Sequence, residues 1–111
     1  MESPMDFVTG MSLTFEQANV DFSLFYRDAF QGVGDAASAK IMGTVLVDEV
    51  AHVRHGLAYF EAWRDPSLSQ WEAYCQALKF PLTPARAKGT SFSVIHRQQA
   101  GLTMDFIERL R

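Results

Sequence analysis

Two residues able to bind a metal ion, Glu49 and His52, lie one helical turn apart in the middle of an apolar stretch. Polar groups at the centre of an apolar helix face are costly unless something satisfies them. A Glu-x-x-His pair is also what one helix of a bundle contributes to a di-iron or di-manganese carboxylate site. By simple counting, such a pair arises by chance in about one sequence of this composition in six, so the motif needs support from elsewhere. The stretch has the period of one helical face, and the residues of that face are Ile41, Val45, Glu49, His52, Val53, Phe60 and Trp63.

Support for the motif comes from Glu16, which precedes a glycine-containing break at Gly32–Gly34. Two long helices joined by a short glycine turn form an antiparallel hairpin. Counted from Val33, Glu16 lies 17 residues back, whereas Glu49 and His52 lie 16 and 19 residues forward. At about 1.5 Å per residue, all three reach nearly the same height above the turn. We therefore predict a metal site formed by Glu16, Glu49 and His52.

The hairpin that must position these ligands is predicted to span residues 12–64. Ser12 is a candidate N-cap of the first helix, which leaves residues 1–10 as a short lead-in. Asp35 is a good N-cap for the second helix, and Asp65-Pro66 ends it because the residue before a proline avoids the helical region.

The remainder, residues 65–111, is predicted to contain short helices and an irregular segment. We expect one helix over residues 67–78, another over residues 93–100 that is stopped by Gly101, and a last one capped by Thr103. The buried side of the first of these is predicted to consist of Trp71, Tyr74, Cys75 and Leu78. The whole chain, residues 1–111, is predicted to be one all-α domain.

Composition limits the classes of function. The chain has 111 residues, a formal net charge of −3 and one cysteine, Cys75. These features argue against a nucleic-acid partner, an intrachain disulfide and a cysteine zinc site. Because the sequence has no evident signal peptide and no apolar run of about 20 residues, we expect a cytoplasmic protein with no membrane partner.

The hairpin motifs resemble those of the ferritin-like di-iron carboxylate superfamily. Glu16 on one helix and Asp48-Glu-Val-Ala-His-Val53 on the next carry the resemblance, with weaker support from the tail between Pro84 and Gly101. The chain is similar in particular to uncharacterised bacterial members related to tRNA-modifying monooxygenases. This resemblance implies half of a four-helix bundle, which usually takes one Glu from each of two helices and a Glu-x-x-His from each of the other two. We expect a homodimer or higher oligomer to complete the bundle, unless the first half belongs to another chain or has been lost.

Several neighbouring residues have both a functional and a structural interpretation. Asp48, His55 and Tyr59 are candidates for supporting positions around the ligands, with an exposed acid, a partly exposed or core histidine and a core tyrosine as the alternatives. We expect Trp63, Phe60, Phe15 and Phe22 to lie in the core and His96 to be structural or exposed. The charged side chains of Asp21, Arg27 and Asp28 are expected to face water. The same is expected of Arg86, Lys88 and Arg97, with binding of an anionic substrate or RNA as the alternative.

Two functions follow from these interpretations. The first is a di-metal oxidoreductase of unknown substrate. Carboxylate oxygens with one imidazole per metal suit iron best, with manganese as the alternative. Oxidase, oxygenase and ferroxidase activities all stay open, as does the catalytic residue. The second is a non-enzymatic helical module for oligomerisation or interaction, without metal.

Overall fold

The computed structural model describes residues 3–111, and every regular element in this range is a helix. This confirms the all-α prediction. The elements in chain order are α1 (Pro4–Phe7), the π-helix η1 (Val8–Glu16), α2 (Gln17–Gly32), α3 (Ala36–Trp63), α4 (Gln70–Ala77), the 3₁₀-helix η2 (Pro84–Ala87), α5 (Val94–Ala100) and α6 (Met104–Leu110).

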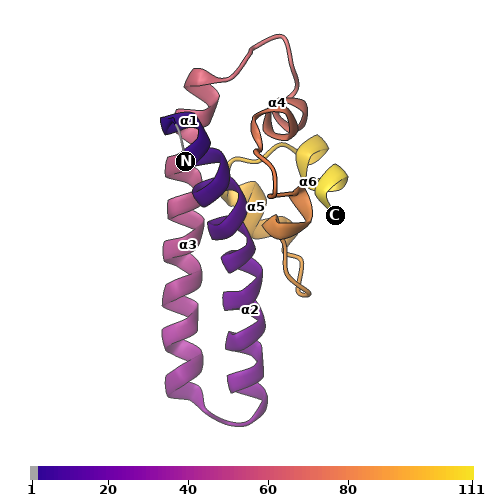
Figure 1. The fold of residues 1–111 in the computed structure, drawn as a ribbon. Coiled ribbons are helices and arrows are strands. Elements are labelled where there is room, and N and C mark those ends of the chain that lie inside the picture. The colour runs from indigo at the N-terminus through magenta and orange to yellow at the C-terminus, as the bar shows by residue number, and fades with distance from the viewer. Residues whose placement is uncertain (1–2) are drawn as a thin grey trace.

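A long antiparallel hairpin dominates the molecule (Figure 1). One arm is the continuous run α1–η1–α2, and the other is α3. The predicted turn is confirmed, because Gly34 has a φ of 81° and the Asp35 side chain accepts a hydrogen bond from the Ser38 amide at 3.0 Å. A left-handed residue followed by an N-cap reverses the chain within a few residues.

The first arm starts earlier than the sequence suggested. Ser3 caps a helix that begins at Pro4, and the arm continues without a break through Gly10. The predicted lead-in is therefore wrong from residue 3 onward, while residues 1–2 lie outside the described range. Ser12 is not an N-cap either, because it is buried inside the π-helix. A serine followed by proline at the first helical position was the local signal for the true start.

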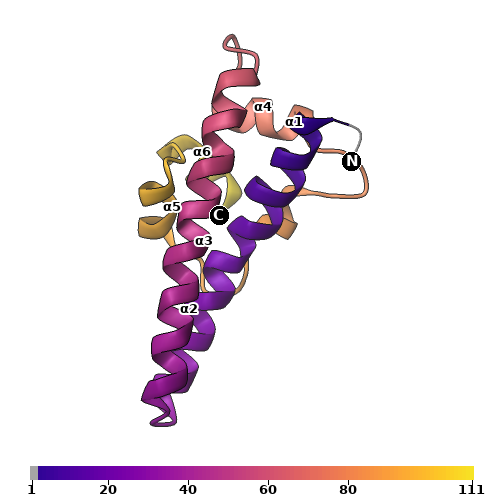
Figure 2. The same cartoon turned by 90° about the vertical axis from the view of Figure 1, so that its left-hand side faces the viewer.

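The C-terminal helices pack beside the half of the hairpin that is distant from the turn (Figures 1 and 2). Their predicted starts agree with the structure to within a few residues, and Ser69, Ser93 and Thr103 cap them. Ser69 forms a capping box with Glu72. These caps fix where each short helix begins.

The core of this half contains the aromatic side chains of Phe60, Tyr74 and Phe106, all fully buried. Trp71 packs edge-on against Phe106, at 5.2 Å between ring centroids. The prediction that Cys75 is buried was wrong, since its side chain is exposed.

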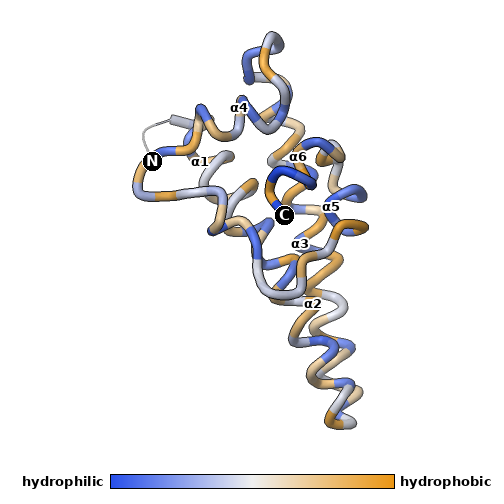
Figure 3. The backbone as a smooth tube through the Cα atoms, turned by 90° about the vertical axis from the view of Figure 1, so that its right-hand side faces the viewer, coloured by the Kyte–Doolittle hydropathy of each residue, from blue (hydrophilic) through white to orange (hydrophobic). Residues whose placement is uncertain are grey.

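Apolar side chains also remain exposed on the hairpin. Figure 3 shows hydrophobic positions recurring along α2 and α3. Phe22, Tyr59 and Trp63, predicted to lie in the core, are exposed in this single chain. The C-terminal helices cover only part of the hairpin surface, and about half of each of these three residues stays exposed. Among the described residues, no helix has the length and hydropathy needed to cross a membrane.

Candidate metal centre

Glu16, Glu49 and His52 come together where the two arms of the hairpin face each other. The Nδ1 atom of His52 lies 3.0 Å from Glu16 Oε2 and 3.0 Å from Glu49 Oε1. One ligand atom from each of the three residues lies within 4.8 Å of the other two. The height matching predicted from the sequence therefore places these side chains in one cluster.

The cluster is partly buried, and the burial is uneven. The side chains of Glu49 and Glu16 are 13% and 25% exposed, whereas His52 is 54% exposed. Glu49 Oε2 is buried and has no hydrogen-bond partner among the described residues. A buried carboxylate oxygen without a partner loses its hydration and gains nothing in return. The donor set therefore leaves one oxygen in need of a positively charged or hydrogen-bonding partner.

A close helix crossing one turn away holds the two arms together at this height. Gly56 faces Ser12, and a Cβ added to Gly56 would overlap the Cβ and Oγ atoms of Ser12. Gly56 lies four residues after His52, and Ser12 lies four residues before Glu16. The absence of a side chain at Gly56 thus sets the short distance between the arms beside the cluster.

The π-helix ends at Glu16, so the cluster lies at the junction of π-helical and α-helical backbone. Gln17 stabilises this junction, because its Nε2 donates to the Leu13 carbonyl at 2.6 Å. The Nε of Arg97 in turn donates to Gln17 Oε1 at 2.7 Å. Local π-helical turns are often found at functional sites. The neighbour of Glu16 in the sequence is therefore fixed by a residue 80 positions away.

Arg97 also forms a buried ion pair with Asp21, through two contacts of 2.7 Å. Asp21 accepts two further hydrogen bonds, from the amides of Gly89 and Ser93, both at 2.9 Å. The predictions that Asp21 and Arg97 face water were wrong. Burial of such a pair is tolerated because both groups find partners in good geometry.

Sequence reasoning missed the Gln17–Asp21–Arg97 network, although one signal was present. Gln17 and Asp21 are polar and one turn apart, beside apolar positions such as Val20 that point to the core. Polar residues on a buried face call for a partner. Nothing local in the sequence identified Arg97 as that partner.

The three supporting candidates do not join the cluster. Asp48 is exposed and lies outside the group of ligand atoms. His55 is exposed and packs edge-on against Tyr59, at 5.2 Å between ring centroids. Tyr59 in turn packs against Trp63 at 5.4 Å. His55 thus meets the expectation of a partly exposed histidine, whereas the core position expected for Tyr59 was wrong.

The π-helix is also fixed to α4. Thr14 Oγ1 donates to the Thr9 carbonyl and lies 2.8 Å from the hydroxyl of Tyr74. Because the Thr14 hydroxyl has one proton, Tyr74 donates in this pair. Burial raises the pKa of Tyr74 to about 12, although the bond to Thr14 opposes the rise. The buried tyrosine therefore keeps its proton at neutral pH and holds the π-helix against the C-terminal helices.

His96 lies outside the hairpin, as expected, and is half-buried beside Ser93. Burial lowers its pKa, and the nearby positive charge of Arg27 lowers it further. The neutral His96 ring forms a hydrogen bond with the Ser93 hydroxyl through its Nδ1 atom and takes no part in the Glu16–Glu49–His52 cluster.

Residues 1–108 match the family described as "Protein of unknown function (DUF455)", and the chain belongs to this family. No curated protein and no solved structure matches the chain. The family description assigns no activity, so the function has to be inferred from the geometry of the site.

Proposed function

We propose that this chain is a ferritin-like metal-binding protein in which Glu16, Glu49 and His52 hold iron or manganese. We further propose that two paired chains form a di-metal oxidoreductase centre. The observation that carries this proposal is the convergence of two carboxylates and one imidazole around the buried, unpartnered Oε2 of Glu49. A cation would give that oxygen the partner it lacks.

The donor set fits these metals. Carboxylate oxygens suit hard cations, and a single imidazole extends the fit to iron and manganese; the three ligands include no soft thiolate. When bound, such a metal supplies Lewis-acid and one-electron redox chemistry. Metal ligands must be unprotonated, so His52 would offer its Nδ1 lone pair to the metal and carry its remaining proton on Nε2.

The protein's own contribution is to position the ligands and to limit their access to water. The mostly buried Glu49 is held by α3, and Glu16 is held by the junction that Gln17 stabilises. The more exposed His52 leaves one side of the cluster open to a partner chain or a small molecule. This arrangement keeps two negative charges close together, which favours cation binding.

Pairing of two chains follows from the number of ligands. A di-metal bundle site usually takes a Glu from each of two helices and a Glu-x-x-His from each of two others. This hairpin offers one of each, so two copies about a two-fold axis would supply the full set. Exposed apolar residues support the pairing, because Ile41, Tyr59 and Trp63 project from the same stripe of α3 as His52. The substrate, if the centre is catalytic, is a small molecule or the metal ion itself.

Metal content tests the proposal. We expect protein purified without chelator, or loaded anaerobically with iron, to hold about one metal ion per chain. His52→Ala should lose it, whereas His55→Ala, which removes an exposed histidine from the next turn, should keep it. Glu49→Gln and Asp48→Asn form a second matched pair of variants. Equal metal content in all of these proteins, or no metal in any of them, would refute the metal site.

The second candidate, a metal-free helical assembly module, is favoured by the same exposed stripe of Ile41, Tyr59 and Trp63. The stability of Glu49→Ala separates the two functions. In a metal-free module Glu49 is only a desolvated carboxylate, so its removal should stabilise the chain without changing metal content. In a metal centre, the same variant should lose metal and the stability that metal binding adds. Sedimentation should give a dimer or larger in both cases, and a folded monomer would contradict both.

A further inference from the structure

A cavity of about 550 Å³ lies at the end of the molecule opposite the hairpin turn, between α1, η1 and the loop after α4. It lies outside the proposed metal centre, because none of its lining residues belongs to the Glu16–Glu49–His52 cluster. Its volume is in the range of pockets that hold small organic ligands. The chemistry of its wall indicates what it would bind.

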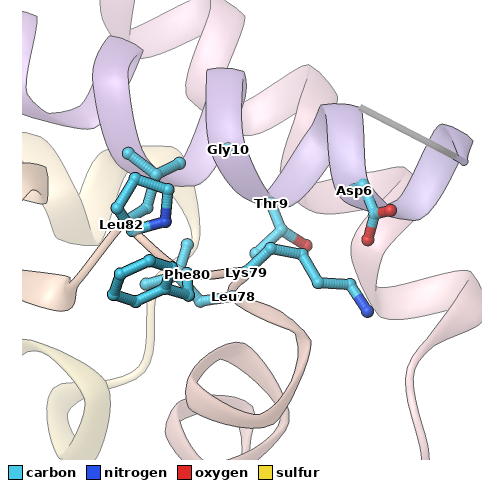
Figure 4. A pocket seen from close by; sticks show the side chains of 8 residues that line it. Asp6, Thr9, Gly10, Leu78, Lys79, Phe80 and Leu82 are labelled. Atoms are coloured by element: carbon cyan, nitrogen blue, oxygen red, sulfur yellow. The ribbon is translucent and has the colours of Figure 1, made fainter.

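One end of this cavity is polar (Figure 4). Asp6, Thr9 and Lys79 lie there, from α1, η1 and the loop. Within residues 3–111, Asp6 and Lys79 form no ion pair with each other or with any other side chain. Two opposite charges thus border the same space without neutralising one another.

The hydroxyl of Thr9 gives a second, independent indication of a ligand. Thr9 is only 1% exposed, and its Oγ1 has no hydrogen-bond partner in the part of the chain that the structure describes. A buried hydroxyl without a partner is costly, and native proteins rarely leave one so. Because this oxygen is closed to solvent, a polar ligand atom at this end of the cavity would supply the missing hydrogen bond once the Thr9 side chain turns toward it.

The other end is apolar and contains Phe80 and Leu82 (Figure 4). Phe80 is 96% exposed, which is unusual for a side chain of this size. A ring in this position adds little to the core and offers a face for an apolar group to cover.

We propose that this cavity binds a free α-amino acid with an aromatic or branched apolar side chain. The ammonium group would face Asp6, the carboxylate would face Lys79, and one of these groups would reach the Thr9 hydroxyl. The apolar side chain would cover Phe80 and Leu82. A ligand with both charges fits the unpaired Asp6 and Lys79 better than a simple anion or cation does, because either of those would leave one charge unmatched.

Calorimetric titration with L-phenylalanine tests this proposal, with two analogues that each lack one charge. We expect L-phenylalanine to bind saturably at one per chain. Phenylpropionate, which lacks the ammonium group, and phenethylamine, which lacks the carboxylate, should bind about tenfold or more weakly, as expected for loss of a charged hydrogen bond. Equal binding of the three compounds, or no saturable binding of L-phenylalanine at millimolar concentration, would overturn the proposal.

Variants assign each contact. Asp6→Asn should remove the preference for L-phenylalanine over phenylpropionate, and Lys79→Met should remove the preference over phenethylamine. Thr9→Val keeps the shape of the side chain and should weaken the binding of L-phenylalanine and of the one analogue that retains the group facing Thr9. Lys40→Met, which removes an exposed lysine of α3, is the matched control and should bind as the wild type does.

Amide chemical shifts show whether the ligand sits in this cavity. On addition of L-phenylalanine, the largest changes should fall on the amides of Thr9, Gly10, Lys79, Phe80 and Leu82. Changes confined to α3 would contradict the location. Glu49→Gln should bind L-phenylalanine normally, so a failure of this proposal is distinguishable from a failure of the metal centre.

Discussion

Replacement of Gly56 by alanine tests the idea that one close helix crossing sets the geometry of the cluster. The new methyl group would overlap Ser12, whose Cβ and Oγ atoms occupy that space. The Ser12 Oγ atom could rotate away, but the Cβ atom is fixed by the backbone, so the two arms of the hairpin must move apart. Overpacking of this kind typically costs about 1–3 kcal/mol.

Gly43→Ala is a matched control on the same helix. A Cβ at Gly43 would meet only the Cδ of Arg27, at an ordinary contact distance of 3.8 Å. Both substitutions gain about 0.5–1 kcal/mol from the better helix propensity of alanine. Because this gain cancels between them, the difference in unfolding free energy should equal the overlap cost, about 1–3 kcal/mol, with Gly43→Ala the more stable.

Urea unfolding followed by circular dichroism measures that difference. In metal titrations Gly56→Ala should also bind iron or manganese more weakly, since Glu16 and His52 lie one turn from the crossing, whereas Gly43→Ala should bind normally. Equal stability of the two variants, or tighter metal binding by Gly56→Ala, would refute the reasoning.

Three further predictions concern the groups behind the cluster. Removal of one partner of the buried ion pair, as in Asp21→Leu or Arg97→Met, should cost about 3–5 kcal/mol of unfolding free energy, and the double variant should cost less than the sum; additive losses in urea unfolding would contradict the coupling. Since the pKa of Tyr74 is raised to about 12, its contribution to stability should be complete below pH 10 and lost as the pH rises through 12; Tyr74→Phe should remove that pH dependence, and its persistence in denaturation midpoints would contradict the assignment. Gln17→Leu, which leaves the Leu13 carbonyl without its side-chain donor, should weaken metal binding more than Gln98→Leu, the replacement of an exposed glutamine on α5; equal affinities in metal titrations would show that the junction does not position Glu16.

The hairpin and the caps followed from local signals in the sequence. A glycine turn with Asp35 after it, and Thr103 before an apolar run, act within a few residues of where they occur. The convergence of Glu16 with Glu49 also followed, because residue counts from a fixed turn give the height on each arm. These features depend on short-range geometry, and sequence patterns record such geometry well.

The π-helix and the buried ion pair were not predictable in this way. A π-helix has a wider turn, so residues five positions apart, such as the buried Thr9 and Thr14, come together where an α-helix would pair residues three or four apart. Arg97 pairs with Asp21, which lies 76 positions away in the sequence. Without knowledge of that partner, an isolated charged residue is expected to face water. Tyr59 was misplaced for a different reason, because an apolar helix face looks the same whether it is covered by its own chain or by another.

The position of the cluster implies that the proposed metal binding and the proposed chain pairing would depend on each other. His52 shares its stripe of α3 with the exposed Ile41, Tyr59 and Trp63, so both events would use one surface. Two events that each stabilise the other must do so by the same factor in both directions. We therefore expect iron or manganese to lower the dimer dissociation constant measured by sedimentation. Pairing should raise metal affinity equally.

His52→Ala should abolish the metal effect on pairing while leaving the metal-free dimer in place, whereas Tyr59→Ser should weaken the dimer with and without metal. Dimer dissociation constants that are identical with and without bound metal would show that the site is complete within one chain, and the pairing argument would then fail even if the metal is bound.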